Sequence, residues 1–316
     1  MIDISKSIPG YKYIPVITGP TASGKSSLAL DVCRKTGGEL ISADSMQIYK
    51  GLDIGTAKDT SEERAEIMHH MTDIAEPGTY FNVSDYVTAC YEVIDSLLAH
   101  GKLPVICGGT GQYISALYYG FDYGKDASAD EETARLEEEF ARDGIEGIYA
   151  RLVERDPEAA AKIHPNNTRR VIRALAVIES TGKTFTEKNN ESTNEGPKYP
   201  FKLFMIDMDR EVLYDRINRR VDIMLDEGLE QEARALYDSD ADKKSTCFQA
   251  IGYKEFKDYF EGASDIDEAV YNIKLRSRHY AKRQLTWFRA MGDDVIKLSP
   301  GDAGKNVQQV LDTISL

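Results

Sequence analysis

Short apolar runs alternate with longer amphipathic segments along most of this chain. The apolar runs have the length of buried strands, and they are Tyr13–Thr18, Glu39–Asp44, Leu103–Cys107, Lys202–Asp207 and Val295–Leu298. Segments predicted to be helical lie between or after them, namely Ser27–Thr36, the stretch that begins at Asn82, Glu211–Glu227, Glu268–Met291 and Val307–Ile314. Strands that alternate with helices in this way are typical of an α/β protein with an open, doubly wound parallel sheet.

The helix that begins at Asn82 has the clearest sequence pattern. Asn82 is a favourable N-cap residue, Asp85 stands three positions later, and Gly101 ends the segment. Apolar residues recur at helical spacing between them, at Val87, Cys90, Tyr91, Ile94, Leu97 and Leu98. This spacing predicts an amphipathic helix that packs one face on the sheet.

The character of the chain changes at Phe121, where the strand-like runs stop. Four charged helices are predicted in succession, at Ala129–Phe140, Gly147–Glu154, Pro157–Ile163 and Thr168–Ser180. The polar run Thr186–Pro200 contains few apolar residues, and we expect it to be mobile. We therefore predict a core domain of residues 1–120 and 201–316 with an all-helical insertion of residues 121–200.

The stretch GPTASGKS follows the first predicted strand and matches the pattern G-x-x-x-x-G-K-[ST]. In this pattern glycines let successive backbone N–H groups face an anion, and the following helix presents its positive N-terminal end to it. Lys25 adds a full charge, and the Ser26 hydroxyl is the expected Mg²⁺ ligand. The residues predicted to hold a diphosphate or a nucleotide are Gly19, Pro20, Thr21, Ala22, Ser23, Gly24, Lys25 and Ser26. Together with the alternating elements, this loop predicts a phosphate-loop NTPase-like core.

Two further stretches are predicted to face the same ligand crevice. Asp44 ends the second predicted strand, and the carboxyl ends of parallel strands line such crevices. The glycine-rich turn Gly108–Tyr113 follows the third strand and carries Thr110. These features fit a small-molecule kinase, a nucleotide-driven switch or a transferase that acts on a diphosphate. A switch is disfavoured, because no acidic residue closes the third strand and no N-K-x-D motif is present, whereas a kinase with Asp44 as its base stays open.

The formal net charge of −14 argues against a polyanionic partner, but charge acts locally because the Debye length is about 8 Å at physiological salt. No acidic residue occurs between Tyr271 and Gly292. The helix predicted there carries cations four residues apart at Lys274, Arg278 and Lys282, with Tyr280, Trp287 and Phe288 among them. This pattern predicts a nucleic-acid face, and the alternative is that the cations pair with carboxylates elsewhere in the chain.

The remaining residue types suggest no metal site or disulfide framework. Cys33, Cys90, Cys107 and Cys247 lie far apart and are expected to be reduced core residues. His69 and His70 match no metal-ligand spacing and are expected to make hydrogen bonds. Because no leader-like or membrane-spanning segment is present, we expect a cytoplasmic protein, and we expect a monomer.

Six segments in this order resemble the tRNA dimethylallyltransferase (tRNA isopentenyltransferase) family: GPTASGKS, ISADSMQIYKGLDIGTAK, GGTGQY, HPNNTRRVIRAL, QAIGYKE and AKRQLTWFR. The resemblance covers essentially the whole chain. It implies transfer of a dimethylallyl group from dimethylallyl diphosphate to N6 of the adenosine next to the anticodon (position 37) in tRNAs that read codons beginning with U. It also implies Mg²⁺ as a cofactor, release of diphosphate, and an insertion that grips the anticodon arm.

The resemblance also implies roles for individual residues. Asp44 is the candidate base, Lys25 and Thr110 are further catalytic candidates, and Arg216 or Arg220 is expected to reach the diphosphate. The residues expected to contact tRNA are Asp44, Ser45, Met46, Gln47, Thr110, Arg135, Arg169, Arg170, Val171, Ile172, Arg173, Gln249, Ala250, Ile251, Gly252, Tyr253 and Lys254. Arg135 stands in a segment that is one residue shorter than in many members. The alternatives are an isopentenyltransferase that acts on free adenine nucleotides and an RNA-binding module without activity.

Overall fold

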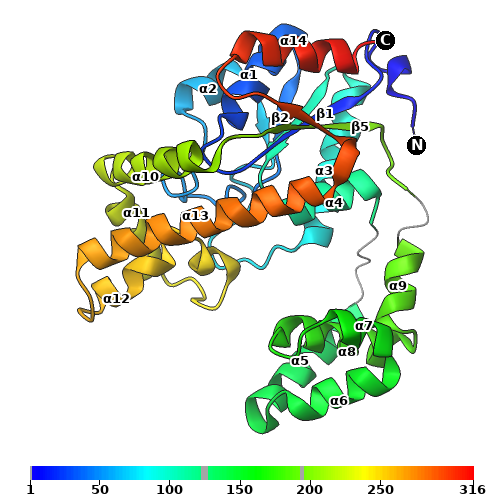
Figure 1. Cartoon of the computed structure of the whole chain (residues 1–316), viewed down its shortest axis with the longest axis vertical. Helices are drawn as coiled ribbons and strands as arrows, with labels where there is room; N and C mark the ends of the chain where they lie inside the picture. The colour runs from blue at the N-terminus through cyan, green and yellow to red at the C-terminus, as the bar shows by residue number, and fades with distance from the viewer. Residues whose placement is uncertain (1, 122–126, 193–195) are drawn as a thin grey trace. The chain divides into compact units, whose positions relative to one another are not determined.

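The computed structural model describes residues 2–121, 127–192 and 196–316. The chain forms two compact units, one of Met1–Tyr118 with Pro197–Leu316 and one of Tyr119–Gly196. Figure 1 shows the first, which we call the core unit, as a sheet surrounded by helices. The second, which we call the helical unit, contains helices alone in its described residues (Figure 1).

A six-stranded sheet forms the centre of the core unit as far as the structure describes it, in the order β3-β2-β4-β1-β5-β6, and all neighbouring strands are parallel. The strands are β1 (Ile14–Thr18), β2 (Glu39–Ser42), β3 (His69–His70), β4 (Pro104–Gly108), β5 (Phe201–Ile206) and β6 (Val295–Leu298). Every residue of β1 and β4 is buried, because parallel sheets of this kind are covered on both faces. The predicted α/β class is confirmed, and the short edge strand β3 had no counterpart in the prediction.

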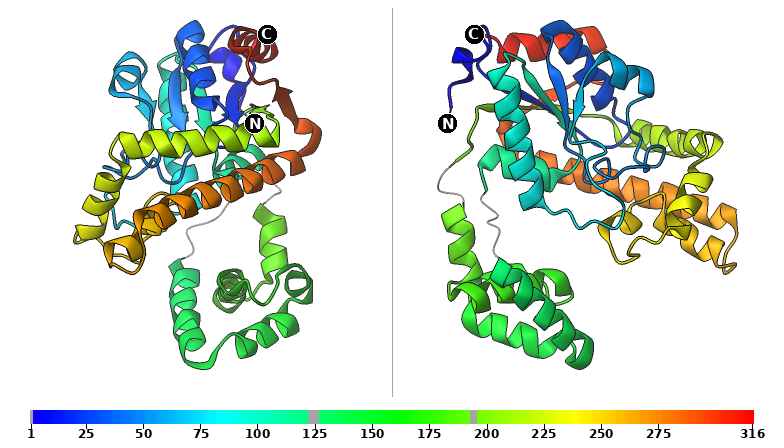
Figure 2. Two further views of the ribbon diagram at one scale, coloured as in Figure 1. Left: turned by 60° about the vertical axis from the view of Figure 1, so that its left-hand side comes forward. Right: turned by 180° about the vertical axis from the view of Figure 1, so that it is seen from behind.

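Helices pack on this sheet and on one another. Their bounds in the core unit are α1 (Lys25–Thr36), α2 (Ser61–Glu66), α3 (Val83–Ala99), α4 (Gly111–Tyr119), α10 (Arg210–Asp226), α11 (Leu229–Asp238), α12 (Lys257–Phe260), α13 (Ile266–Ala290) and α14 (Ala303–Ile314). Short 3-10 helices span Ile4–Lys6, Thr246–Gln249, Lys254–Phe256 and Gly292–Asp294. Helices α1 and α14 pack together against the sheet, and α10 lies beside α13 (Figures 1 and 2). The long helix α13 therefore spans the side of the core unit on which α10 also lies.

The capping of α3 is the one that the sequence predicts. The Asn82 side chain accepts hydrogen bonds from the backbone N–H groups of Ser84 (2.8 Å) and Asp85 (3.1 Å), and the Asp85 carboxylate accepts from the Asn82 N–H (3.1 Å). This reciprocal capping box fixes the first turn. Tyr86 is buried under the helix and donates its hydroxyl to the Ser42 carbonyl (3.1 Å), which ties α3 to the end of β2.

The helical unit contains α5 (Ala127–Asp143), α6 (Glu146–Arg155), α7 (Pro157–Lys162), α8 (Thr168–Thr181) and α9 (Phe185–Ser192). Leu136, Ile148, Leu152 and Leu175 are fully buried among them and give this unit a core of its own. Part of the run expected to be mobile is therefore helical, because Thr186–Ser192 belong to α9. The Asp156 carboxylate anchors this helix by accepting from the N–H (2.9 Å) and the hydroxyl (2.9 Å) of Thr186. Residues 193–195 of the same run lie outside the described residues.

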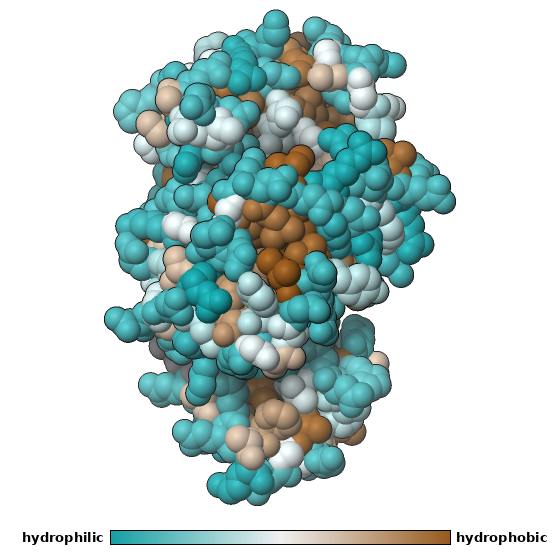
Figure 3. Space-filling model, turned by 90° about the vertical axis from the view of Figure 1, so that its left-hand side faces the viewer, coloured by the Kyte–Doolittle hydropathy of each residue, from teal (hydrophilic) through white to brown (hydrophobic). Residues whose placement is uncertain are grey.

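The surface drawn in Figure 3 is mostly hydrophilic, with a patch of hydrophobic residues near the middle of that face. Among the described helices, none combines the length and the apolar character that crossing a bilayer requires.

Candidate active site

The loop Gly19–Ser26 connects β1 to α1 and is shaped by unusual backbone angles. Gly24 (φ +94°) and Ala22 (φ +63°) are both left-handed, a conformation that costs an alanine about 1–2 kcal/mol. A Cβ at Gly19 would lie 3.1 Å from the Ser23 hydroxyl and 3.3 Å from the Ile206 carbonyl, so a side chain there would crowd the loop. The Ser23 hydroxyl is buried without a hydrogen-bond partner among the described residues. A strained loop with an unsatisfied buried donor fits an anion as its missing partner.

Lys25 lies at the start of α1 and folds back over the loop, with its ammonium 3.4 Å from the Pro20 carbonyl. Burial lowers the pKa of Lys25, because removal from water disfavours the charged form, and Arg220 adds repulsion. Asp44 and Asp59 act in the opposite direction. Lys25 and Arg220 therefore lie close enough to repel each other, and a bound anion would stabilise both cations.

A small cavity of about 60 Å³ adjoins the loop, and we call it the cradle cavity. Its walls are mostly polar and come from Thr21, Lys25, Ser26, Leu40, Ser42, Asp44, Gln47, Thr56, Ala57, Asp59, Cys107, Gly108, Arg220, Tyr280 and Gln284. Because Lys25, Ser26 and Asp44 line the same space, the predicted proximity of Asp44 to the loop is observed. Its chemical role stays a prediction.

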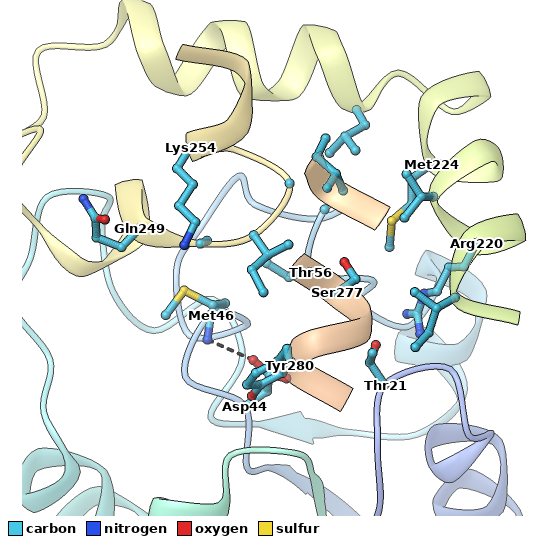
Figure 4. A pocket seen from close by; sticks show the side chains of 18 of the residues that line it. Thr21, Asp44, Met46, Thr56, Arg220, Met224, Gln249, Lys254, Ser277 and Tyr280 are labelled. Carbon is cyan, nitrogen blue, oxygen red and sulfur yellow. Dashed lines mark hydrogen bonds between the residues drawn. The ribbon is translucent and has the colours of Figure 1, made fainter. Parts of the chain in front are cut away.

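A larger cavity of about 280 Å³ adjoins the first, and we call it the apolar cavity. Many of its wall residues are apolar, and these are Met46, Ile217, Val221, Met224, Leu229, Ala250, Ile251 and Ile273. The two cavities share Thr21, Asp44, Thr56, Arg220 and Tyr280. Figure 4 looks into the apolar cavity, with Thr21, Asp44 and Tyr280 toward one end and Gln249 and Lys254 toward the other. A carboxylate and a guanidinium therefore stand where the polar space meets the apolar one.

Asp44 is held by the segment that follows β2. Its carboxylate accepts from the Met46 N–H (2.9 Å). The N–H of Ser45, which lies between these two residues, donates to the Thr110 hydroxyl (3.0 Å). The Thr110 N–H donates to the Ala43 carbonyl (3.1 Å). A Cβ at Gly108 would lie 2.2 Å from that carbonyl oxygen, so the close approach of the two segments requires glycine. Thr110 thus positions the segment that carries Asp44.

Gln284 of α13 joins the two glycine-rich turns, and sequence reasoning did not identify it. Its side-chain oxygen accepts from the Thr21 N–H (2.9 Å), and its side-chain amide donates to the Gly109 carbonyl (2.9 Å). Tyr280, one turn earlier on α13, lines both cavities, and burial together with the charge of Asp44 raises its pKa. Gln284 lies in the segment AKRQLTWFR, for which the sequence predicted a role only for the charged and aromatic residues.

The basic stripe of α13 is partly neutralised. Lys274 pairs with Asp222 (2.5 Å), and Arg276 (3.3 Å) and Arg289 (2.8 Å) contact Glu255 and Asp207. Arg278 donates to the Asn218 side chain (2.6 Å). For Lys274, Arg276 and Arg289 the alternative, pairing with carboxylates elsewhere in the chain, is the one observed, whereas Arg278 bonds to a neutral amide.

One aromatic residue of α13 differs from the prediction of a nucleic-acid face. Phe288 is fully buried, because it faces the core of the unit, so its assignment to such a face is wrong. Trp287 is about half exposed, and its indole N–H donates to the Ser115 hydroxyl (2.8 Å). A Cβ at Gly111 would lie 2.7 Å from the Trp287 ring, so the ring rests on the start of α4.

The arginines of α10 divide as the helical spacing predicts. Arg220 lines both cavities, and burial lowers its pKa while Asp44 opposes that shift. Arg216, one turn earlier, approaches the loop, since its guanidinium would lie 3.9 Å from a Cβ at Gly24. Arg219 instead pairs with Asp215 (2.5 Å) on the exposed side. Arg216 and Arg220 are therefore the α10 cations available to an anion in the loop.

The residues of α8 that were assigned to tRNA contact include an exposed pair and a buried pair. Arg169 and Arg170 are exposed, and neither forms an ion pair within the described part of the chain. Val171 and Ile172 are buried in the core of the helical unit, so the expectation that their side chains contact tRNA is wrong. Arg173 approaches the Thr133 hydroxyl at 3.5 Å.

Arg135 lies in an acidic network within the helical unit. It contacts Glu132 (2.5 Å), Glu139 (3.8 Å) and Glu179, and Arg151 pairs with the last two carboxylates as well. A phosphate would have to compete with these carboxylates for the guanidinium. Its assignment as a tRNA contact stays a prediction.

The segment Gln249–Lys254 forms one wall of the apolar cavity through five residues, which are Gln249, Ala250, Ile251, Gly252 and Lys254. Tyr253 does not line this cavity, because its ring is buried and its hydroxyl donates to Glu232 (2.5 Å). The Gln47 side chain forms hydrogen bonds within the protein: it accepts from the Ser42 hydroxyl (2.8 Å) and donates to the carbonyls of Thr56 and Ala57.

The histidines and cysteines behave as the sequence indicates. His69 bonds to Asp59 (3.0 Å) and the Ile67 carbonyl (2.7 Å), and His70 bonds to Glu39 (2.8 Å). The four cysteines are buried and unpaired with one another. In the described part of the chain, no group of three His, Cys, Asp or Glu residues could hold a metal ion.

The family model for IPP transferases matches residues 47–291, which is well over half of the chain. The chain belongs to the IPP transferase family. A second model, for isopentenyl transferases, matches residues 12–70, which include the phosphate loop. The resemblance to tRNA dimethylallyltransferases is therefore confirmed.

Similar members of the IPP transferase family are found in several bacteria. A tRNA dimethylallyltransferase of Oceanobacillus iheyensis is 45% identical over 300 residues, which cover 95% of both chains. One of Geobacillus thermodenitrificans is 48% identical over 277 residues, which cover 87% of both. These relatives match across most of their own length, so the likeness is not confined to the phosphate loop.

Solved structures of the IPP transferase family share the fold. The tRNA isopentenylpyrophosphate transferase of Bacillus halodurans matches with a TM-score of 0.71 at 40% identity, over 95% of both chains. A eukaryotic dimethylallyltransferase described as acting on tRNA matches with a TM-score of 0.82 at 31% identity, over 94% of this chain and 77% of that one. The predicted phosphate-loop NTPase-like core is confirmed by this likeness.

Proposed function

We propose that this chain transfers a dimethylallyl group from dimethylallyl diphosphate to N6 of the adenosine next to the anticodon in tRNA, and releases diphosphate. The relatives are named as tRNA dimethylallyltransferases, and one neighbour is described as acting on tRNA. The observation that carries the proposal to this chain is the shared boundary of the two cavities. There the Asp44 carboxylate, Arg220 and the loop residue Thr21 line both a polar space and an apolar one.

Asp44 is the base in this proposal. An exocyclic adenine amine is a weak nucleophile, because its lone pair is delocalised into the ring. A carboxylate within hydrogen-bond reach takes one N6 proton as the new N–C bond forms, an effect of about 10²- to 10⁴-fold. The bond between the allylic carbon and the diphosphate oxygen breaks in the same reaction, and its electron pair leaves with the diphosphate. Atoms and charges therefore balance without an oxidant or reductant.

The cradle cavity stabilises the leaving group. Negative charge accumulates on the bridging oxygen as the allylic carbon departs, so fixed donors aimed at it stabilise the transition state more than the ground state. Lys25, Arg220 and the backbone N–H groups of Gly24, Lys25 and Ser26 at the start of α1 are those donors, with Arg216 beside the loop. The apolar cavity takes the flipped adenine together with the five-carbon chain that it attacks.

The donor set near the loop fits Mg²⁺. Ser26 and the carboxylates of Asp44 and Asp59 supply oxygen atoms to the cradle cavity, and Mg²⁺ is usually held by one or two protein oxygens plus substrate phosphates and water. Ser26 would hold the ion beside the diphosphate. When bound, the ion would neutralise charge on the diphosphate oxygens.

The acceptor is proposed to be tRNA rather than a free adenine nucleotide. A base in the anticodon loop must be flipped out at a cost of a few kcal/mol, and contacts to the surrounding RNA must offset that cost. The exposed Arg169 and Arg170 of the helical unit and Lys254 beside the apolar cavity support such contacts. A kinase would need no apolar cavity beside the base. We further propose a cytoplasmic location, which a tRNA substrate supports.

The experiment that tests the proposal uses dimethylallyl diphosphate labelled with ¹⁴C in the prenyl group. The protein is incubated with it, Mg²⁺ and either total tRNA or AMP, and digested RNA is analysed by mass spectrometry. The proposal expects label in tRNA as N6-dimethylallyladenosine next to the anticodon. Label in AMP with none in tRNA would establish the free-nucleotide alternative, and label in neither would refute the proposed function.

A further inference from the structure

Glu232 of α11 accepts four hydrogen bonds from two other segments of the core unit. Its carboxylate receives the backbone N–H groups of Asp53 (2.8 Å), Ile54 (2.9 Å) and Gly55 (2.9 Å). The Tyr253 hydroxyl donates the fourth bond at 2.5 Å. Three successive N–H groups that converge on one carboxylate form an anion-binding concavity, which here is filled by a side chain of the same protein.

The two segments that meet at Glu232 are walls of the apolar cavity. Gly55 and Thr56 belong to one wall, and Gln249–Gly252 with Lys254 belong to another. The contact between the segments is tight, since a Cβ at Gly55 would lie 2.6 Å from the Tyr253 ring. Glu232 itself is not among the residues that line either cavity. Its effect on the cavity is therefore indirect.

The segment fixed by Glu232 continues toward Asp44 through a second set of bonds. The Gln47 side-chain amide donates to the carbonyls of Thr56 (3.2 Å) and Ala57 (3.3 Å), and its oxygen accepts from the Ser42 hydroxyl (2.8 Å). Ser42 and Gln47 lie on either side of Asp44 in the sequence. A shift of residues 53–57 would therefore move the backbone that presents the Asp44 carboxylate.

We propose that Glu232 is a positioning residue for the transfer reaction: it fixes residues 53–57, and through them the apolar cavity and the orientation of Asp44. This inference rests on the proposed function. Hydrogen bonds to an ionised acceptor are about twice as strong as neutral ones, so a carboxylate suits this place. Glutamine has the same shape, but its NH₂ group would face backbone donors and leave some of the four without an acceptor. The loop Gly19–Ser26 lies outside this network, so binding of the diphosphate should depend on it little.

The test compares Glu232→Gln with Tyr253→Phe, which removes one of the four bonds, and with Glu230→Gln. Glu230 lies on the same helix and accepts only the Tyr259 hydroxyl (3.2 Å) in the hydrogen bonds of the described residues, which makes it a matched control. For Glu232→Gln we expect kcat to fall about ten- to a hundredfold, the effect of a misplaced catalytic group. KM for dimethylallyl diphosphate should change less than kcat does, because the diphosphate group is bound by the loop Gly19–Ser26, which lies outside the network, and only the five-carbon chain contacts the apolar cavity. Tyr253→Phe should lose less, and Glu230→Gln should match the wild type.

Hydrogen exchange provides a readout that does not depend on activity. The amides of Asp53, Ile54 and Gly55 should exchange at least several-fold faster in Glu232→Gln and keep their wild-type rates in Glu230→Gln. Unchanged kcat in Glu232→Gln, or unchanged exchange of these amides, would overturn the inference. If Glu232→Gln does not fold, a wild-type kcat and wild-type exchange in Tyr253→Phe would overturn it instead. A wild-type protein without transfer activity would refute the proposed function, while the exchange rates would still report on the network.

Discussion

The two cavities of the core unit meet at Asp44 but are built differently. The cradle cavity takes Thr21, Lys25 and Ser26 from one continuous loop, and its walls carry charge and hydroxyl groups. The apolar cavity takes most of its apolar wall residues from α10, α11, α13 and the segment Gln249–Lys254, which lie far from the loop in the sequence. One short motif thus supplies the lysine and two hydroxyl groups of the anion site, to which distant helices add Arg220 and Gln284, whereas most of the apolar wall depends on how distant segments pack.

The difference between the cavities matches the two halves of a prenyl diphosphate. Its diphosphate is strongly charged and needs fixed donors, and its five-carbon chain is apolar and is excluded from water more readily than bound by polar groups. A base at the boundary can act on a nucleophile that approaches the carbon joining the two halves. The predictions that follow alter the boundary, then each cavity, and then a surface remote from both.

Removal of the boundary carboxylate should have the largest effect. Asp44→Asn keeps the size of the side chain and loses its ability to take a proton, so kcat should fall by about 10²- to 10⁴-fold. The affinity for tRNA should stay close to that of the wild type, because the exposed cations are untouched. Single-turnover transfer and a binding titration measure the two quantities. Unchanged turnover would remove Asp44 as the base.

Removal of the cradle charge should have the next largest effect. Lys25→Met keeps the length of the side chain and deletes its ammonium, so kcat/KM for dimethylallyl diphosphate should fall by about 10²- to 10³-fold, as for the loss of one strong transition-state donor. Lys35→Met, which changes an exposed lysine of the same helix, serves as the control and should behave as the wild type. Equal activity of the two variants would show that the diphosphate binds elsewhere.

A charge placed in the apolar cavity should have a smaller effect. Met224→Glu introduces a carboxylate into this wall, and kcat/KM for the donor should fall by about tenfold, because the charge keeps water in the space and repels the diphosphate. Met224→Leu is the matched control and should retain most of the activity. Steady-state kinetics with varied donor provide the comparison. Full activity of Met224→Glu would place the prenyl chain outside this cavity.

The smallest effect is expected at the helical unit. Replacement of Arg169 and Arg170 by alanine should weaken tRNA binding several-fold and reduce the slope of log K against log salt by about 0.7 for each single-strand phosphate that the protein no longer neutralises. Arg219→Ala, which removes an arginine already paired with Asp215, is the control. Filter binding at several salt concentrations gives both slopes. A tRNA affinity that does not depend on salt would contradict electrostatic docking.

The parts of the molecule that the sequence predicted are those with local signals. The phosphate loop, the five longer strands and the capping box at Asn82 each depend on a few neighbouring residues. The strand β3 was not predicted, because it has only two residues and shows no alternation of apolar and polar positions. The helix α9 was not predicted, because the residue that anchors its start, Asp156, lies thirty positions before Thr186 in the sequence.

The candidate site was predicted where a motif or the family resemblance pointed to its residues, and it was missed where a residue acts through hydrogen bonds to distant segments. Gln284 and Glu232 have no motif of their own, since most of their partners are backbone groups of segments far away in the chain. Val171 and Ile172 were assigned to RNA contact as part of the segment Arg169–Arg173 that the resemblance implies, although their side chains lie in the core of the helical unit. The prediction of a basic stripe on α13 overestimated the unpaired positive charge, because carboxylates of other segments neutralise part of it.

A crystal structure of this chain with Mg²⁺, diphosphate and an anticodon stem-loop RNA would test the central claim most directly. The account predicts diphosphate against Lys25 and the loop N–H groups, with an extruded adenine whose N6 lies at about 2.6–3.2 Å from the Asp44 carboxylate. An adenine that stays stacked in the RNA loop, or one that binds away from Asp44 while diphosphate occupies the cradle cavity, would contradict it.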